Sequence, residues 1–429
     1  MPEPTTSKLL TDATAISSEW LRELNLRSLI EEQLKASGIA DVDVDVVAIG
    51  KAAIEMATAT SAILGTRVLR RLVICDEEGA AQGLDKEVVV GEHPTPGAGS
   101  LQAGRELLEF LSVPTSAQCT LFLLSGGASS LCALPETPLT LEDMRGVWAA
   151  ALTSGIDITT LNKLRAATSA IAGGGVLRHV RTARSQTLIM VDNIISGARW
   201  VGSGLTYDYA PGRDEFASLL RQVGLAGSAL GDRLFAAFEH RSIAMATLVT
   251  SVHENSVIAE PGLMLSLAVE EARRRGYRVV QMGSHVHGDV AKVTAQWRET
   301  ILAETQAGDP VCVIGAGEVT VKVRGTGAGG RGQEFAWSMA SVLAGLPREG
   351  AFVARASDGR DFVAGVGGAW VDRSTIEHAR QRGFEWSRVL EDNDTNSALQ
   401  ALGQVLAGGH TGWNLCDLYV ALIKAAPSV

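Results

Sequence analysis

The feature that most constrains the fold of this 429-residue chain is a recurring order of elements: a short apolar strand, then glycine or small polar residues, then a helical pattern. Residues 41–50 end in Gly50 before a helical segment, and residues 120–130 break into a Gly/Ser loop. Apolar strands that alternate with helices are typical of a mostly parallel sheet covered on both faces. The sequence therefore predicts an α/β fold with a Rossmann-like parallel sheet. Further strands are expected at residues 71–76, 87–96, 187–192, 310–325 (with a turn at 315–317) and 351–361.

The chain is longer than one ordinary core, because domains commonly hold roughly 100–200 residues. We expect a Rossmann-like domain in residues 1–245 and a second, smaller α/β domain in residues 246–429. No internal repeat or low-complexity linker marks the boundary. Residues 1–15 are polar and are expected to be loose, ahead of a helix over residues 16–36.

The charge pattern bears on the partners of the protein. The formal net charge is −10, and the only basic run, Arg273–Arg275, lies at a helix end where cations favour the dipole. A nucleic-acid partner needs clustered cations, so none is expected. No stretch of about 18 apolar residues and no signal-like N-terminus is present, and the five cysteines form no C-x-x-C pair. We expect a cytoplasmic protein without a membrane partner.

Two loops have the character of anion-binding loops. Gly50 and Lys51 follow the first strand, and a lysine there can neutralise phosphate or carboxylate. The alternative is a lysine at a helix start that keeps its charge in water. The loop Ser125–Ser129 offers two glycines and two hydroxyls after a buried strand. Ligands of open α/β sheets bind at this carboxyl edge, so both loops are candidates.

Two carboxylates are expected near strand ends. Asp192 ends the strand at 187–192, and Asp358 follows the strand that begins at residue 351. Carboxylates in this position hold Mg²⁺ or take a proton from a substrate hydroxyl. Either residue could instead form a turn or cap a helix.

Two other motifs suggest different chemistry. The run Gly325–Gly330 contains G-x-G-x-x-G between a strand and a helix, which would suit a nicotinamide cofactor. Such matches arise often in a chain with 46 glycines, and Arg331 follows the run directly. His285, His287 and Asp289 match the start of a metallohydrolase motif, but a helix N-cap at Asp289 is the favoured interpretation.

The order of motifs along the chain is more specific than any one of them. The ordered segments are GKAAIEMA, EHPTPGAGSLQAG, LLSGGASSL, SGIDITTLNKLR, SGLT, GEVTVKV, GGRGQE, SDGRD and TGWNLCDL. This set resembles the glycerate 2-kinase family, whose C-terminal part is called the MOFRL domain. The resemblance extends over about residues 45–420.

The resemblance implies an active site in a cleft between the two domains. It also implies transfer of the γ-phosphoryl group of ATP to the 2-hydroxyl of D-glycerate, with Mg²⁺. Residues are assigned by their match to the family motifs. The catalytic residues would be Lys51, Arg331 and Asp192, and the metal ligands Asp192 and Asp358. The substrate- or phosphate-binding residues would be Ser125, Gly126, Gly127, Ser129, Arg165, His410 and Asn414.

The chain departs from the family pattern at several of these motifs. Where the family has R-K-H-L-S-x-I-K-G-G, two lysines and a histidine are replaced by Ala166, Ala167 and Ala172. Each lost charge-assisted contact would cost about 1.5–3 kcal/mol. The scaffold glycines remain, so we expect the same fold with an altered substrate or altered chemistry. Further departures are Ser196 for a second aspartate, Gly332 for an asparagine, Phe362–Gly368 for G-P-T-D-A-A-G, and His410 with Trp413, which would reshape the pocket.

The favoured function is an ATP-dependent kinase for a small 2-hydroxy acid, D-glycerate or a relative with a larger or less charged end. Three alternatives stay open at this point. One is an enzyme that has lost ATP chemistry and acts on a hydroxy-acid or sugar-acid metabolite. The others are a nicotinamide-dependent hydroxypyruvate reductase and a silent binding protein. A homodimer is compatible with all of them, and nucleotide binding separates the kinase from the rest.

Overall fold

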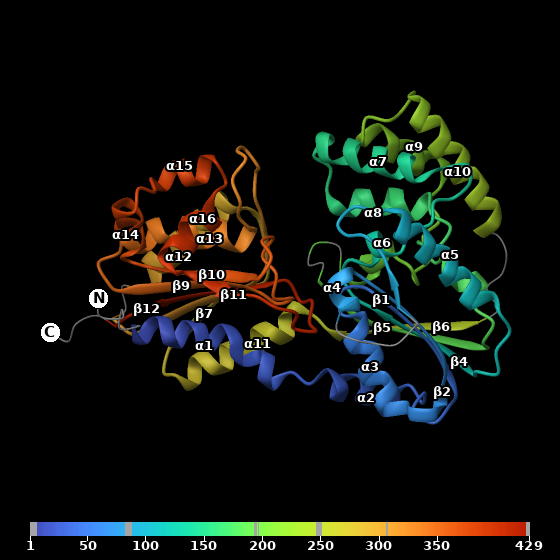
Figure 1. Ribbon diagram of the computed structural model, residues 1–429, viewed down its shortest axis with the longest axis horizontal. Helices are drawn as coiled ribbons and strands as arrows, with labels where there is room; N and C mark the ends of the chain where they lie inside the picture. The colour runs from blue at the N-terminus through green and yellow to red at the C-terminus, as the bar shows by residue number, and fades with distance from the viewer. Residues whose placement is uncertain are drawn as a thin grey trace. The chain divides into compact units, whose positions relative to one another are not determined.

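The protein divides into two compact units in the computed structural model, which describes residues 7–81, 88–192, 195, 197–245, 251–305 and 308–425. The parallel-sheet unit is Asn25–Ala259, and the mixed-sheet unit combines Met1–Leu24 with Glu260–Val429. Each unit contains a six-stranded sheet with helices packed on it (Figure 1). The predicted α/β class with two sheets is confirmed. The domain boundary at residue 245 and the cleft between domains stay predictions.

The first sheet is built as the sequence predicts. Every neighbouring pair of its strands is parallel, and the order is β3-β2-β1-β4-β5-β6. The order reverses direction between β1 and β4, so their carboxyl ends form the switch point where such sheets bind ligands. The strands are β1 (Val44–Ile49), β2 (Val68–Cys75), β3 (Val88–Val90), β4 (Cys119–Leu124), β5 (Arg184–Met190) and β6 (Val252–Ala259).

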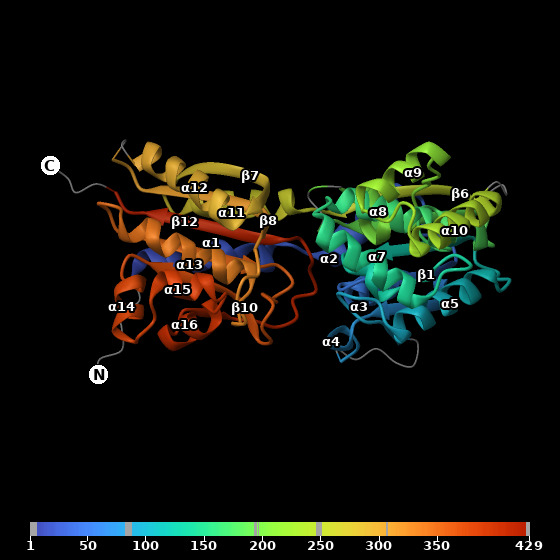
Figure 2. The ribbon, with the colours of Figure 1, turned by 90° about the horizontal axis from the view of Figure 1, so that it is seen from above.

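Helices cover both faces of this sheet. Helices α2 (Leu26–Ala36) and α3 (Ala53–Leu64) lie on one side, and α7–α10 lie on the other (Figure 1). Seen from above, α7–α10 gather over the strands (Figure 2). They have a core of their own, in which Phe216 stacks on Phe238 with ring centroids 4.3 Å apart. The remaining helices are α4 (Glu77–Ala80), α5 (Ala98–Ser112), α6 (Ala128–Leu131), α7 (Leu141–Ser154), α8 (Ile158–Ala167), α9 (Arg213–Gln222) and α10 (Ala229–Met245).

The second sheet is mixed, in the order β11-β10-β9-β12-β8-β7. Only β7 and β8 pair in parallel. Helices α1 and α11 cover one face, and α12 and α13 cover the other (Figure 1). The strands are β7 (Arg278–Asp289), β8 (Val311–Thr320), β9 (Gly350–Ala356), β10 (Val366–Asp372), β11 (Val405–Ala407) and β12 (Asp417–Ile423). The helices are α1 (Lys8–Glu23), α11 (Pro261–Arg274), α12 (Val290–Glu304), α13 (Arg331–Ala344), α14 (Thr375–Gln381), α15 (Trp386–Glu391) and α16 (Thr395–Leu402).

Over the described residues, the expectation that 1–15 are loose and 16–36 form one helix was wrong; residues 1–6 lie outside the described residues. Helix α1 begins at Lys8, where the Ser7 side chain accepts the Leu10 N–H at 3.2 Å, and a break at Leu24 separates it from α2. The carboxylate of Asp12 accepts bonds from Arg275 at 2.6 Å and from the Tyr277 hydroxyl at 2.8 Å. These partners lie far along the chain, so the local polar pattern could not reveal them.

The turn expected at Gly315–Gly317 is absent, because β8 runs straight through both glycines. The glycines instead admit the backbone of β7: a Cβ on Gly317 would lie 2.0 Å from the Val286 carbonyl oxygen. In the same region Asp289 caps α12 by accepting the Ala291 N–H at 3.0 Å, as predicted. Within the described ranges, none of the helices combines the length and apolar character needed to cross a bilayer.

Candidate active site

The loops after β1 and β4 are tied together at the switch point. The Lys51 N–H donates to the Gly126 carbonyl at 3.0 Å, and the Ala52 N–H donates to the Ser125 hydroxyl at 3.0 Å. Gly50 has a φ of +131°, and a Cβ there would lie 2.2 Å from the Ser125 Oγ. Only glycine fits this approach, since a side chain would separate the loops. The two loops that the sequence marked as anion-binding therefore form one structure.

Gly127 brings two more side chains to this crevice. Its φ is +83°, and a Cβ built on it would lie 3.3 Å from the Cγ of Lys51 and 3.3 Å from the Cδ2 of His93. Lys51 and His93 thus flank the same glycine. The sequence alone suggested a structural turn for His93, and its place beside Lys51 comes from the parallel order of β3 and β1 across β2. A cation and an imidazole at one sheet edge suit an anionic ligand.

A chain of buried polar side chains extends from Ser129. The Ser129 and Ser203 hydroxyl oxygens are 2.8 Å apart, and the Ser203 hydroxyl donates to the Asn162 Oδ1 at 3.1 Å. Ser203 is buried and has a φ of +55°, which is unusual for a residue other than glycine. Strain of this kind collects at functional sites. Ser203 and Asn162 lie in the segments SGLT and SGIDITTLNKLR, but sequence reasoning assigned them no role, because single hydroxyl and amide residues carry no signal of their own.

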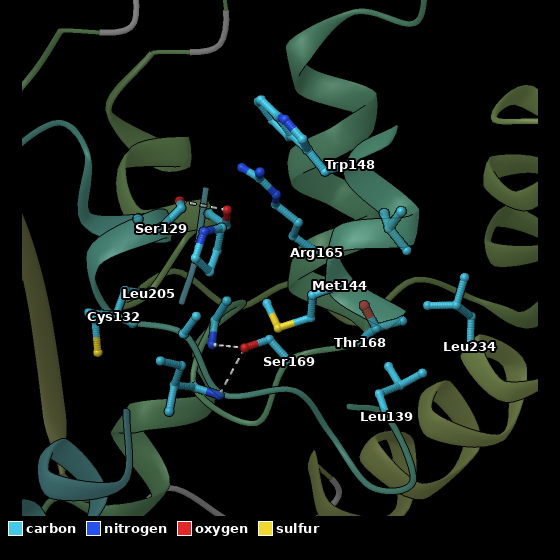
Figure 3. Close-up of a pocket in the computed structure, with 17 residues that line it drawn as sticks. Ser129, Cys132, Leu139, Met144, Trp148, Arg165, Thr168, Ser169, Leu205 and Leu234 are labelled. Carbon is cyan, nitrogen blue, oxygen red and sulfur yellow. Dashed lines mark hydrogen bonds between the residues drawn. The ribbon is translucent and has the colours of Figure 1, made fainter. Parts of the chain in front are cut away.

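Arg165 on α8 points into a pocket beside these hydroxyls (Figure 3). Its guanidinium lies 4.7 Å from the centroid of the Trp148 ring. Burial lowers the pKa of Arg165 to about 10, so the side chain stays charged at neutral pH. No carboxylate within the described ranges forms a salt bridge with it, although a half-buried cation is costly without an anion. Arg165 is therefore placed to receive the negative charge of a ligand.

The pocket around Arg165 has an empty volume of about 640 Å³, its open mouth included. Ser129 and Ser203 line it near Arg165, and apolar side chains of α7 and α10 form part of the rest of its wall. Trp148 was not expected in the site from the sequence. The sequence predicts that a tryptophan on an amphipathic helix packs in the core. Its contact with the Arg165 guanidinium shows that it also lines the pocket.

Arg331, the expected cation of the mixed-sheet unit, is already paired. It donates to Asp417 at 2.8 and 3.3 Å and also bonds Glu318. Burial alone would lower the pKa of Arg331, but the two carboxylates raise it above its usual value. Asp417 also accepts a bond from the Tyr419 hydroxyl at 3.2 Å. The protein itself thus neutralises Arg331, and its role as a catalytic cation stays a prediction.

Asp361 lies buried at the start of α13, directly beside this network. Its carboxylate accepts the N–H groups of Gly332 at 3.1 Å and Gln333 at 2.7 Å. Burial, aided by the charge of Asp417, raises the pKa of Asp361 to about 6. The side chain of the asparagine that the family has at position 332 would face Asp361, since a Cβ there would lie 3.2 Å from the carboxylate.

This pKa predicts how stability depends on pH. The raised pKa means that folded Asp361 binds its proton more tightly than the unfolded chain does. Its contribution to stability is complete below pH 3.8 and is lost as the pH rises through about 6. Relative to Asp361→Asn, the wild type should lose on the order of 3 kcal/mol between pH 4 and pH 7. Urea unfolding across this range measures the difference, and parallel curves for the two proteins would contradict the assignment.

The other predicted site residues lie in separate segments of the two units. Asp192 follows β5 in the parallel-sheet unit. Asp358 follows β9 in the mixed-sheet unit, where its carboxylate accepts the Arg360 N–H at 2.9 Å. His410 is half-buried and Asn414 is buried in the loop before β12. Among the residues that the structure describes, no three His, Cys, Asp or Glu gather as a metal site. The roles of these residues stay predictions, and position 196 lies outside the described residues.

The expectation that Trp413 reshapes a pocket is not supported. Its ring is buried and packs edge-on against Trp20 of α1, with centroids 6.5 Å apart. Trp413 therefore belongs to the core of the mixed-sheet unit. Sequence position beside a family motif did not distinguish these two roles.

The glycine run at 325–330 is explained by packing. A Cβ on Gly325 would lie 2.4 Å from the backbone of Asp392, and one on Gly327 would lie 2.5 Å from Asp394. The glycine run packs directly against residues 392–394, the segment between α15 and α16, and leaves no room there for side chains. The glycines thus have a structural reason that needs no dinucleotide, and the nicotinamide interpretation is not favoured.

The chain matches known proteins over most of its length. A family model described as a domain of unknown function (DUF4147) matches residues 12–238, and the MOFRL family matches residues 311–417. The D-glycerate 2-kinase of Thermotoga maritima is 30% identical over 387 residues, which are 88% of this chain and 90% of that protein. This chain belongs to the glycerate 2-kinase family.

Other members of the glycerate 2-kinase family agree with this assignment. The glycerate 2-kinase of Pyrococcus horikoshii is 29% identical over 89% of this chain and 87% of that protein. The crystal structure of a glycerate kinase from Thermotoga maritima aligns with a TM-score of 0.81 at 25% identity, covering 96% of this chain and 99% of that chain. The predicted kinase-type enzyme class is therefore confirmed at the level of the glycerate 2-kinase family.

Proposed function

We propose that this protein is an ATP-dependent kinase that phosphorylates the 2-hydroxyl of a small 2-hydroxy acid, D-glycerate or a relative. The observation that carries the proposal is Arg165, a charged guanidinium in a pocket that no described carboxylate neutralises. Lys51 and the Ser125–Ser129 loop stand at the switch point of the same sheet. A hydroxy acid and a phosphate donor are both anionic, so these groups suit them. The names of the related kinases support the same reaction.

In phosphoryl transfer the protein mainly positions the two substrates and stabilises the negative charge on the transferred group. The substrate hydroxyl oxygen forms a bond to the γ-phosphorus of ATP, while the bond to the β–γ bridging oxygen breaks and its electron pair leaves with ADP. The hydroxyl proton passes to solvent. Positive groups that face the transferred oxygens stabilise this transition state, and little covalent help is needed. We assign Lys51 to these oxygens. Arg331 stays a predicted cation, since Asp417 and Glu318 already pair with it.

The donor set fits a metal that arrives with the nucleotide. Mg²⁺ usually keeps several waters and binds through one or two carboxylates plus substrate phosphates. The described residues offer no cage of three ligands, and Asp192 follows β5, on the same sheet as Lys51. We propose Asp192 as a ligand and keep Asp358 as the second candidate. When bound, the ion would neutralise charge on the phosphates.

A cytoplasmic location and a homodimer stay predictions.

The test is ADP release from ATP and Mg²⁺ with a panel of hydroxy acids that includes D-glycerate. We expect acid-dependent ADP from the wild type and a loss of about 10- to 150-fold in kcat/KM for Lys51→Ala, the value of one charge-assisted contact. The matched control is Lys35→Ala, since Lys35 pairs with Glu31 on the exposed face of α2. If no acid elicits ADP, and ATP gives no thermal shift, the kinase proposal fails.

A further inference from the structure

The wall of the pocket beside Arg165 is more apolar than a three-carbon acid requires. Its wall includes Leu139, Met144 and Val147 from α7 and the segment before it, and Leu234 from α10. Leu139 and Met144 are only half-buried, so they keep surface for a ligand. Glycerate carries a hydroxymethyl group, which would bury a polar hydroxyl against this wall at a cost.

The charged group of the pocket and the linked hydroxyls of Ser129 and Ser203 lie on one side. Thr168 lines the apolar side, but its hydroxyl already donates to the Leu164 carbonyl at 2.8 Å. Figure 3 shows Arg165 extending between Trp148 and Ser129, with Leu139 and Leu234 on the other side of Met144. A ligand that pairs its carboxylate with the guanidinium would therefore direct its remaining carbons toward the apolar wall. Few, well-placed polar groups in an apolar pocket are the usual arrangement for fixing the orientation of a small ligand.

Arg165 is the one charged side chain among the described residues that line this pocket. Ala172 lines it where the motif of the resembling family has a lysine, and Ala167 packs into the core of α7–α10 where the motif has a histidine. The Ser169 hydroxyl accepts the N–H groups of Ile171 and Ala172 at 3.3 and 3.2 Å, so this serine is used within the loop. The pocket thus keeps one cation, Arg165, above an uncharged wall.

We infer that the substrate is a 2-hydroxy acid with an apolar substituent, such as a branched alkyl or aryl group, in place of the hydroxymethyl of glycerate. Arg165 pairs with its carboxylate, and the substituent lies against Leu139, Met144 and Leu234. This inference rests on the proposed function for the reaction itself, in which the 2-hydroxyl gains the phosphoryl group and ADP leaves. It identifies the chemical class of the acid.

The experiment compares kcat/KM for D-2-hydroxyisocaproate and D-3-phenyllactate with kcat/KM for D-glycerate, in the same ADP-release assay. The wild type should prefer at least one apolar acid by about tenfold or more, since hydrophobic pockets discriminate by roughly 10- to 200-fold per methylene group. A parallel titration of the apolar acids without ATP, followed by calorimetry, measures binding independently of turnover.

Met144→Gln places an amide of nearly equal length in the wall. It should reduce the preference for the apolar acid by roughly tenfold, because the amide must be desolvated. Met144→Leu keeps the wall apolar and should retain the preference, which separates polarity from altered packing. Leu302→Gln is the matched control, since Leu302 is a partly exposed residue of α12 in the mixed-sheet unit.

The outcomes separate the two proposals. Turnover of D-glycerate without turnover or binding of apolar acids overturns the inference and leaves the kinase proposal intact. An apolar preference that Met144→Gln does not alter also overturns it. No turnover of any acid, with calorimetric binding of an apolar acid that Arg165→Met abolishes and Met144→Gln weakens, supports the pocket assignment and rejects the kinase reaction. Absence of both turnover and binding rejects both.

Discussion

Replacing Arg165 with methionine is expected to lower kcat/KM for the hydroxy acid by about 10- to 150-fold, because one charge-assisted contact to a ligand is worth roughly 1.5–3 kcal/mol. Methionine keeps an unbranched chain against the Trp148 ring, so the packing at that contact is largely retained. The guanidinium has no described carboxylate partner whose charge would be left behind. The free energy of unfolding should therefore fall little or even rise. Steady-state kinetics and urea unfolding measure the two effects separately.

Two further variants give this prediction its control. Arg165→Lys keeps the charge and loses the planar fork, and it should recover part of the activity if a carboxylate is bound. Arg145→Met removes an exposed arginine of the neighbouring helix α7 that pairs with Glu142 at 3.9 Å, and it should leave the kinetics unchanged. Equal activity of Arg165→Met and wild type would remove Arg165 from the site.

The largest stability effect is expected for Arg241→Met, at about 3–5 kcal/mol of lost unfolding free energy. Arg241 lies buried in α10, and its guanidinium donates to four carbonyl oxygens. Three of these bonds, to Ser169, Ala172 and Gly173, are 2.8 Å long, and the fourth, to Tyr209, is 3.2 Å. Removing it leaves these acceptors without their donor in a buried place. Chemical denaturation monitored by tryptophan fluorescence measures the change.

Arg221→Met is the matched control for this substitution, since Arg221 is an exposed residue of α9 and should change stability by less than about 0.5 kcal/mol. A loss below about 1 kcal/mol for Arg241→Met would show that water replaces the guanidinium. The bonds of Arg241 also fix the backbone of residues 169–173, which form one edge of the pocket. We therefore expect the variant to bind hydroxy acids more weakly even under conditions where it remains folded.

Much of the fold was predictable because it is encoded locally. The strands β1, β4 and β5 are continuous apolar runs, and Gly50 and Gly127 adopt the positive φ values that glycine alone accepts readily. Parallel strands bring their carboxyl ends to one edge, so the meeting of Lys51 with the Ser125–Ser129 loop followed from the pattern. The predicted bounds differ from the observed ones mainly where contacts between distant residues determine a helix end. Helix α1, for example, begins at Lys8 and not at residue 16.

The remainder of the site depends on contacts between residues far apart in the sequence. Arg331, which follows the glycine run, was predicted to be a catalytic cation, but Asp417 of β12 already pairs with it. Ser203 and Trp148 reach the pocket from elements whose sequences resemble ordinary loops and amphipathic helices. Such pairings are set by the order of the strands and the packing of α7–α10, and neither can be deduced from spacing along the chain.

Helix α1 has a consequence for how the protein is made. Helix α1 leaves the ribosome before residues 25–259, yet it packs against β9 and β12, which are synthesised after them. The apolar residues Ile16 and Trp20 therefore have no packing partner while the contiguous stretch 25–259 emerges and folds. The mixed-sheet unit can close only after β12 has left the ribosome. Until then the nascent chain carries an amphipathic helix without its binding surface, which is the kind of segment that chaperones protect during synthesis.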